Sequence, residues 1–169
     1  EASGVGLHDA KALGVATIDA DGDGLLDVAV ANDTQPNFLF RSLGGGTFEE
    51  VGLAAGIAFS EAGASRGAMG IDAGDYDGDG WLDLFVVNGH SRNERNEWEA
   101  RGGLPTTRLF RNREGRFTDV TEETGAGVAL RGQGCVAADL DDDGHTDLYV
   151  TGADRGTLRA SKPRQQRRA

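Results

Sequence analysis

The chain has 169 residues, enough for one domain with a core, and its 27 glycines and 7% aromatic content favour short strands and tight turns over a helical bundle. Its formal net charge is −11, with all 28 acidic residues before residue 155, which argues against a nucleic-acid-binding surface. The single cysteine, Cys135, excludes a disulfide within the chain and lies in an apolar run typical of a small buried thiol. No apolar run reaches membrane-spanning length.

An aspartate-rich segment occurs three times along the chain. The three copies are "DADGDGLLD" (19–27), "DYDGDGWLD" (75–83) and "DLDDDGHTD" (139–147). Their first aspartates are separated by 56 and then by 64 residues, so a unit of roughly 60 residues is present almost three times. Such a period indicates a modular array or a propeller.

Each aspartate segment lies between two strand-like runs. "LGVATI", "AMGIDAG" and "GCVAA" precede the segments, and "LLDVAVAN", "WLDLFVVNG" and "TDLYVTG" follow them. In the first two units a glycine-turned hairpin comes next, "NFLFRSLGGGTFEEV" and "TRLFRNREGRFTDV", followed by a link that ends at Gly56 or Gly125. The opening "EASG" resembles such a link, and the third unit is expected to stop after its second strand.

These patterns predict an all-β fold, a partial β-propeller of four-stranded antiparallel blades with about two and a half blades. An open sandwich of short strands is the alternative, although it does not explain why each unit restarts with the same loop. A closed propeller needs roughly four to eight blades, so the remaining blades or another chain are needed to close it. The predicted organisation is the end of a preceding blade and link at 1–12, blade 1 at 13–56, blade 2 at 57–125 with a long loop at 88–107, the first half of blade 3 at 126–153, and a solvated, disordered basic tail at 154–169.

The pattern D-x-D-x-D-G-x-x-D predicts a calcium loop. The glycine at position 6 permits a sharp turn, position 7 offers a backbone carbonyl, and the aspartates supply hard oxygen ligands, which favour calcium over zinc or copper. An EF-hand requires a glutamate at position 12, where this chain has valine. Polar β-turns are the alternative for any one copy. The predicted ligands of three Ca²⁺ sites are Asp19, Asp21, Asp23, Leu25 and Asp27; Asp75, Asp77, Asp79, Trp81 and Asp83; and Asp139, Asp141, Asp143, His145 and Asp147.

Four other residues stand out in the sequence as possible contact or structural residues. Asp142 is an extra acid in the third loop that fits no ligand position and is expected to face solvent. His90 and Trp98 lie in the long loop 88–107, where they can contact a ligand, although Trp98 can equally cover its own blade. Asp72, in a predicted inner strand, can line a channel or hydrogen-bond at a blade edge. No nucleophile or zinc motif is present, so we expect no catalytic residues.

The three aspartate loops combined with "PNFLFRSLGGGTFEEVGLAAG", "MGIDAGDYDGDGWLDLFVVNGH" and "LFRNREGRFTDVTEETG" resemble a known family over roughly residues 1–153. They are similar to the FG-GAP or VCBS-type calcium repeats of integrin α-like β-propellers, and more closely to the cartilage acidic protein-like (ASPIC/UnbV) proteins. The resemblance implies a propeller of the seven-bladed type, secreted, periplasmic or at the cell surface, with calcium in the loop between the first two strands of each blade. It also implies adhesion or ligand binding without established catalysis.

Two classes of function follow as expectations. The first is a non-enzymatic calcium-binding module that binds a protein or glycan outside the cell, without nucleic acid and without a membrane span. The second is a propeller domain of a carbohydrate-active enzyme, or one accessory to it. The absence of a catalytic constellation in the sequence favours the first class.

Overall fold

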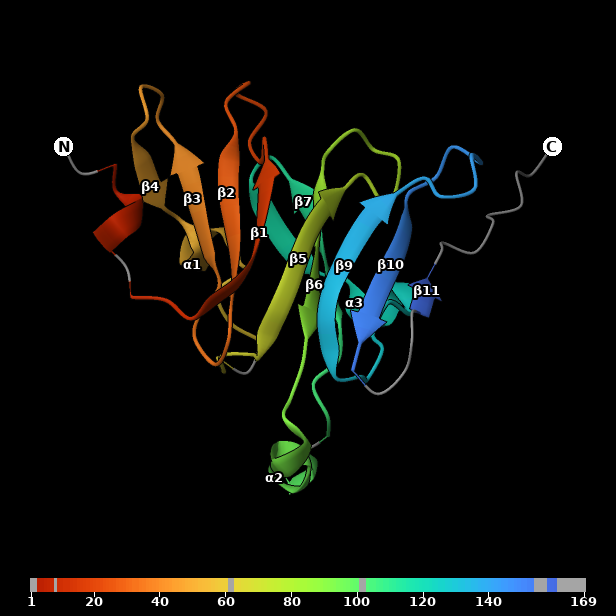
Figure 1. The fold of residues 1–169 in the computed structure, drawn as a ribbon. Helices are drawn as coiled ribbons and strands as arrows, with labels where there is room; N and C mark the ends of the chain where they lie inside the picture. Colours follow the sequence, from red (N-terminus) through yellow and green to blue (C-terminus); the bar gives the residue numbers. More distant parts are fainter. Residues whose placement is uncertain (1–2, 8, 61–62, 101–102, 154–157, 161–169) are drawn as a thin grey trace.

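The structure, a computed structural model, describes residues 3–7, 9–60, 63–100, 103–153 and 158–160, and within them it contains three antiparallel sheets (Figure 1). The first sheet has the order β1-β2-β3-β4 and the second β5-β6-β7-β8, each following the chain, and the third has the order β11-β10-β9. The strands are β1 (Ala12–Ile18), β2 (Asp27–Asn32), β3 (Phe38–Ser42), β4 (Phe48–Glu50), β5 (Ala68–Gly74), β6 (Asp83–Asn88), β7 (Arg108–Arg113), β8 (Arg116–Asp119), β9 (Gly132–Ala138), β10 (Asp147–Gly152) and β11 (Leu158–Ala160).

This arrangement confirms the predicted all-β fold. The two complete sheets are four-stranded and antiparallel like propeller blades, and the sheets do not close into a ring. The third unit differs from the expectation that it ends after two strands. β11 pairs antiparallel with β10, so backbone pairing places a third strand at residues 158–160 although that segment lacks the phenylalanine and glycine pattern of the earlier hairpins. The rest of the expected tail, 154–157 and 161–169, lies outside the described residues.

Short helices occupy the connections. α1 (Gly52–Ala55) and α3 (Thr121–Thr124) form the predicted links after the fourth strands, and they end at Gly56 and Gly125, whose φ values of 96° and 68° are left-handed and favour glycine. The long loop of the second unit contains a 3-10 turn, η2 (Arg92–Glu94), and then α2 (Arg95–Ala100). A further 3-10 turn, η1 (Val5–Leu7), precedes β1. None of the helices within the described residues combines the length and the apolar character needed to cross a membrane.

The apolar core consists of two clusters, and β6 separates them. Successive side chains of a strand point to opposite faces of its sheet. Leu84 and Val86 therefore join the cluster shared with the first sheet, while Phe85 and Val87 join the cluster shared with the third. All six residues of β6 are buried, which explains why its four central residues, 84–87, form a continuous apolar run rather than an alternating pattern.

The inner strands β1, β5 and β9 lie side by side and approach one another at glycines (Figure 1). A Cβ atom added to Gly14 would lie 2.9 Å from the Cα of Gly70, and one added to Gly70 would lie 2.9 Å from the Cα of Gly134. The register of β1 and of β5 shifts immediately before its glycine. One glycine per sheet thus allows neighbouring sheets to approach at backbone distance.

Asp72 links the second and third sheets by a hydrogen bond, in agreement with the blade-edge interpretation. Its Oδ2 accepts from the backbone N–H of Ala137 at 2.8 Å, and its Oδ1 accepts from that of Ala73 at 2.9 Å. Cys135 packs partly buried against the second core cluster. Burial, with a smaller contribution from the charge of Asp72, raises the pKa of the Cys135 thiol to about 12. The thiol is therefore protonated at neutral pH.

Candidate metal sites

The three aspartate loops join the first two strands of each sheet and lie at the same end of the molecule (Figure 1). Each loop turns at its position-6 glycine, and Gly24, Gly80 and Gly144 have φ values of 85°, 91° and 83°. Residues with a side chain rarely adopt this conformation, which accounts for the invariant spacing of the glycine in all three copies.

The first aspartate of each loop organises the backbone around itself. In the first loop, Asp19 accepts hydrogen bonds from the N–H groups of Gly22 and Gly24 at 2.9 and 3.0 Å. Asp75 accepts from three backbone N–H groups of the second loop, and Asp139 from two of the third, at 2.8 to 3.1 Å. These bonds, all within the loop, wrap each loop around its first carboxylate.

The last aspartate of each loop is buried and ties the loop to the sheet. Asp27, Asp83 and Asp147 expose only 1%, 2% and 3% of their surface. The Oδ1 atoms of Asp27 and Asp83 each accept from a backbone N–H in the third strand of the sheet, at 2.8 Å. Their Oδ2 atoms accept from the second loop residue at 3.0 Å, and Asp147 does so at 3.1 Å. Burial is the main cause that raises the pKa of Asp27 and Asp83, so their negative charge is costly unless a cation offsets it.

Within the described residues, three carboxylates of each loop converge so that their oxygens lie within 4.8 Å of one another. The converging groups are Asp19, Asp21 and Asp23; Asp75, Asp77 and Asp83; and Asp139, Asp141 and Asp147. Positions 1 and 3 thus converge in every loop, position 5 only in the first loop, and position 9 only in the second and third. Like charges at this separation repel, and a donor set made entirely of carboxylate oxygens fits a hard cation.

The three predicted ligands at position 7 take part in the hydrogen bonds of their loops. Leu25, Trp81 and His145, at position 7, donate their N–H groups to the position-5 carboxylates at 2.8, 2.8 and 3.0 Å. Whether their carbonyls bind a metal stays a prediction. Asp142, with φ of 58°, is exposed and lies outside the converging group of its loop, as expected.

Two arginines of β7 reach the second loop, and the sequence analysis did not identify them. Nε of Arg111 lies 2.9 Å from Oδ2 of Asp77, and Arg113 forms an ion pair with Asp79. Leu43 takes the place of Arg113 in the first unit, and Arg41 pairs there with Glu49 instead of an aspartate loop. The alternating Arg111 and Arg113 at the end of a strand that pairs antiparallel with the strand after an acidic loop were the signal that could have indicated these contacts.

Side chains also connect the loops of neighbouring sheets. The Asn112 side chain, in β7, donates to the carbonyl oxygen of Ala20 in the first loop at 2.9 Å. Thr146, at the end of the third loop, donates to the carbonyl oxygen of Asp75 at 2.8 Å. A Cβ atom added to Gly22 would lie 3.0 Å from the indole of Trp81. The three candidate metal sites therefore form one connected rim.

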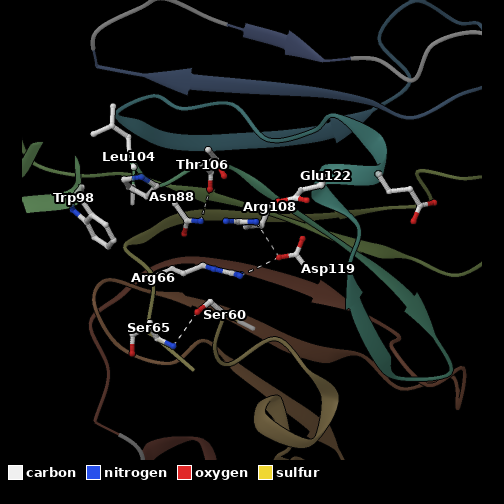
Figure 2. A pocket seen from close by; sticks show the side chains of 14 residues that line it. Ser60, Ser65, Arg66, Asn88, Trp98, Leu104, Thr106, Arg108, Asp119 and Glu122 are labelled. Atoms are coloured by element: carbon white, nitrogen blue, oxygen red, sulfur yellow. Dashed lines mark hydrogen bonds and ion pairs between the residues drawn. The ribbon is translucent and has the colours of Figure 1, made fainter. Parts of the chain in front are cut away.

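The structure separates the two residues predicted to contact a ligand. Trp98, on α2, lines a cavity of about 700 Å³ at the opposite end of the sheets from the aspartate loops (Figures 1 and 2). His90 is nearly buried, with 9% of its surface exposed, and its Nδ1 lies 3.0 Å from the carbonyl oxygen of Ser91. It is not among the described residues that line this cavity.

Comparison with known protein families identifies the repeated unit of this chain. A search of curated proteins found no match to this chain. A family model of the FG-GAP-like repeat matches residues 19–86 and 97–150, which include all three aspartate loops and most of the three sheets. The chain belongs to the FG-GAP-like repeat family.

Proposed function

We propose that this chain is a calcium-binding repeat module, in which Ca²⁺ in each aspartate loop stabilises a β-propeller that binds a protein or glycan outside the cytosol. The observation that carries the proposal is the convergence of three carboxylates in every loop, repeated three times in the described residues. One acidic cluster is common on a protein surface. Three clusters with the same spacing and the same backbone wrapping favour one shared ligand.

The chemistry of the donors favours calcium among the metals. All predicted side-chain ligands are carboxylates, and the loops contain no cysteine and no imidazole within the converging groups. Ca²⁺ takes six to eight oxygen ligands with flexible geometry, whereas Mg²⁺ demands a near-ideal octahedron and Zn²⁺ favours nitrogen and sulfur. A loop that offers several carboxylates and backbone carbonyls fits the larger, more flexible ion.

The hydrogen bonds of the loops give the ion a structural role. Asp83 belongs to the converging group of the second loop, and it also accepts from the backbone of Asn112 in β7. An ion bound by Asp83 would therefore hold the β5–β6 loop and the end of β7 in one arrangement. Binding to the folded state alone stabilises by about 2.7 kcal/mol per site when the ion is at 100 times its dissociation constant.

The family and the affinity of comparable sites support a non-catalytic role outside the cytosol. FG-GAP-like repeats are generally structural modules rather than catalytic ones. Extracellular calcium modules have dissociation constants of about 10⁻⁴–10⁻³ M, which suits secreted, periplasmic or cell-surface proteins. The "LFRN" hairpin supports placing the chain near the cartilage acidic protein-like group with VCBS-type repeats.

Calcium addition to chelator-treated protein tests this proposal. The melting temperature should rise by many degrees, and native mass spectrometry should show three bound ions. The matched variants are Asp141→Asn, within the converging group of the third loop, and Asp142→Asn, beside it but outside the group. Asp141→Asn should lose or strongly weaken one ion, whereas Asp142→Asn should retain all three. An unchanged melting temperature in calcium, or equal behaviour of the two variants, would reject the proposal.

A further inference from the structure

The cavity that Trp98 lines lies beside the second sheet, at the end opposite the candidate metal sites. Its volume of about 700 Å³ is in the range of pockets that enclose small ligands. The walls come from three separate parts of the chain: the segment that joins the first two sheets, the β6–β7 connection, and the stretch from β7 to α3. Lining residues used below are Arg66, Asn88, Trp98, Leu104, Arg108 and Asp119.

Two guanidinium groups share one carboxylate in the middle of this cavity (Figure 2). Nη2 of Arg66 lies 3.2 Å from Oδ2 of Asp119, and Nη1 of Arg108 lies 3.5 Å from the same oxygen. The side chains of Arg66 and Asp119 expose only 12% and 14% of their surface, so this group is held in place. Arg66 also lies over the ring of Phe110, 5.6 Å from its centroid. The cavity thus contains fixed, preorganised hydrogen-bond donors.

A buried acceptor complements these donors. Asn88, 1% exposed, donates from Nδ2 to the carbonyl oxygen of Thr106 at 2.7 Å, while its Oδ1 has no hydrogen-bond partner within the described structure. Asn32 makes the same kind of bond in the first unit and also leaves Oδ1 without a partner, so the asparagine recurs in the first two units, whereas the third has Gly152 at this position. In the second unit Asn88 is one of the residues that line the cavity, so a ligand hydroxyl that reaches its Oδ1 would satisfy this acceptor.

An apolar wall faces one side of the cavity and belongs to the second unit alone. Figure 2 shows Trp98 and Leu104 at one side and the Arg66–Asp119–Arg108 group in the middle. Both apolar residues come from the long loop 88–107, which in the first unit is replaced by the short connection "DTQP" at 33–36. The inserted segment therefore adds an aromatic side chain to a polar cavity.

The charges around the cavity argue for a ligand without net charge. Asp119 already neutralises one of the two arginines, the exposed Glu122 adds negative charge at the rim, and Glu123 beside it is paired with Arg111. An anionic ligand would meet these carboxylates, and a cationic one would meet the guanidinium groups of Arg66 and Arg108. A neutral ligand whose hydroxyls both donate and accept hydrogen bonds meets neither penalty.

We propose that this cavity binds a neutral saccharide of about two sugar rings. The C–H face of one ring would pack on the indole of Trp98, and hydroxyls would accept from Arg66 and Arg108 and donate to Asn88 Oδ1. The inference specifies the ligand of the proposed binding module and rests on that proposed function. The saccharide site is nevertheless separate from the metal loops, so the two can be tested separately.

Isothermal titration with defined probes tests the saccharide site. The neutral probes are cellobiose, maltose, lactose and N,N′-diacetylchitobiose, and the comparison probes are digalacturonic acid and tetraglycine. We expect saturable binding of at least one neutral disaccharide, with digalacturonic acid and tetraglycine weaker. Absence of saturation by every neutral disaccharide, or preferential binding of digalacturonic acid or of tetraglycine, would overturn the proposal.

Tryptophan variants locate the binding. Trp98→Ala should weaken the disaccharide by at least about tenfold, since buried aromatic contacts dominate binding energies, while Trp98→Phe should retain most of the affinity. Leu53→Ala, at an exposed apolar position of α1 outside the cavity and the metal loops, is the control and should bind the disaccharide as the parent does. Circular dichroism verifies that each variant is folded. Binding that Trp98→Ala leaves unchanged would overturn the assignment to this cavity.

The titration is repeated with calcium and with chelator. Failure of saccharide binding in a protein that calcium still stabilises rejects the saccharide site alone. A saccharide that binds equally in chelator, with no calcium effect on melting, supports the site and rejects the calcium proposal.

Discussion

The side-chain amide of Asn112 donates to the carbonyl oxygen of Ala20 at 2.9 Å, although 92 residues separate them in the sequence. The same residue donates its backbone N–H to Asp83 and accepts at Oδ1 from the N–H of Gly115. One fully buried residue therefore connects the first aspartate loop, the second aspartate loop and the turn of the β7–β8 hairpin. At this rim, defined hydrogen bonds connect neighbouring sheets as well as residues within one loop.

Replacement of Asn112 by alanine is expected to lower the free energy of unfolding by about 2–3 kcal/mol, because the change leaves the buried carbonyl of Ala20 without its partner. Urea denaturation followed by circular dichroism measures this loss. Arg116→Ala, at an exposed position of the same hairpin, should change stability by less than about 0.5 kcal/mol. Equal effects of the two substitutions would contradict the linking role.

Replacement of Arg113 by leucine, the residue at this place in the first unit, is expected to tighten cation binding at the second loop. The guanidinium of Arg113 pairs with Asp79 and lies 3.9 Å from Asp77, so it competes with a bound cation. Its side chain is half exposed, so the gain should be modest, about fivefold in affinity. Calcium titration calorimetry measures the change. Arg95→Leu, on α2 and away from the loops, controls for net charge, and an equal gain there would refute the competition.

Replacement of Gly70 by alanine is expected to cost about 1–3 kcal/mol, because the new methyl group would meet the backbone of Gly134 at 2.9 Å. The third unit offers a matched control. A Cβ atom at Gly134 would meet only Oγ1 of Thr151, at an ordinary 3.5 Å, so Gly134→Ala should be close to neutral. Thermal melting of the two variants compares them directly, and similar losses would show that the close approach of the inner strands is unimportant.

The thiol of Cys135 is expected to resist alkylation at pH 8. Its pKa of about 12 keeps it protonated, whereas the unfolded thiol has a pKa near 8.5, so folding should slow iodoacetamide labelling by on the order of a thousandfold. Because the folded pKa is the higher one, the thiol favours the folded state below about pH 8.5, and this contribution is lost as pH rises from there towards 12. Mass spectrometry of labelled protein in buffer and in urea measures the protection, and rapid labelling of the folded protein would disprove it.

Local sequence patterns predicted the strands, the loops and their order because the interactions that form them are local. In the first loop the Asp19 carboxylate binds N–H groups three and five residues away, and Asp27 binds one seven residues away. The spacing of the aspartates and glycines along the sequence is therefore enough to predict the shape of the loop. The same holds for the hairpin of β7 and β8, whose glycine turn is visible in "NREGR".

Contacts between residues far apart in the sequence could not be predicted in this way. Arg66 and Asp119 are 53 residues apart, and their pairing depends on how the segment before β5 lies against the end of β8. Nothing in the periodicity indicated that Trp98 would lie on a short helix beside them, or that His90 would be nearly buried. Pairing of β11 with β10 was missed because backbone hydrogen bonds need no side-chain pattern.

The complete burial of β6 on both faces has a consequence for hydrogen exchange. β6 is covered by a neighbouring sheet on each face and is paired along both edges, with β5 and with β7. Its amide protons therefore cannot exchange through a local opening of the structure. Deuterium should therefore enter β6 only when the whole chain opens. At β1, whose Leu13 and Val15 expose 58% and 62% of their surface, deuterium should enter much earlier.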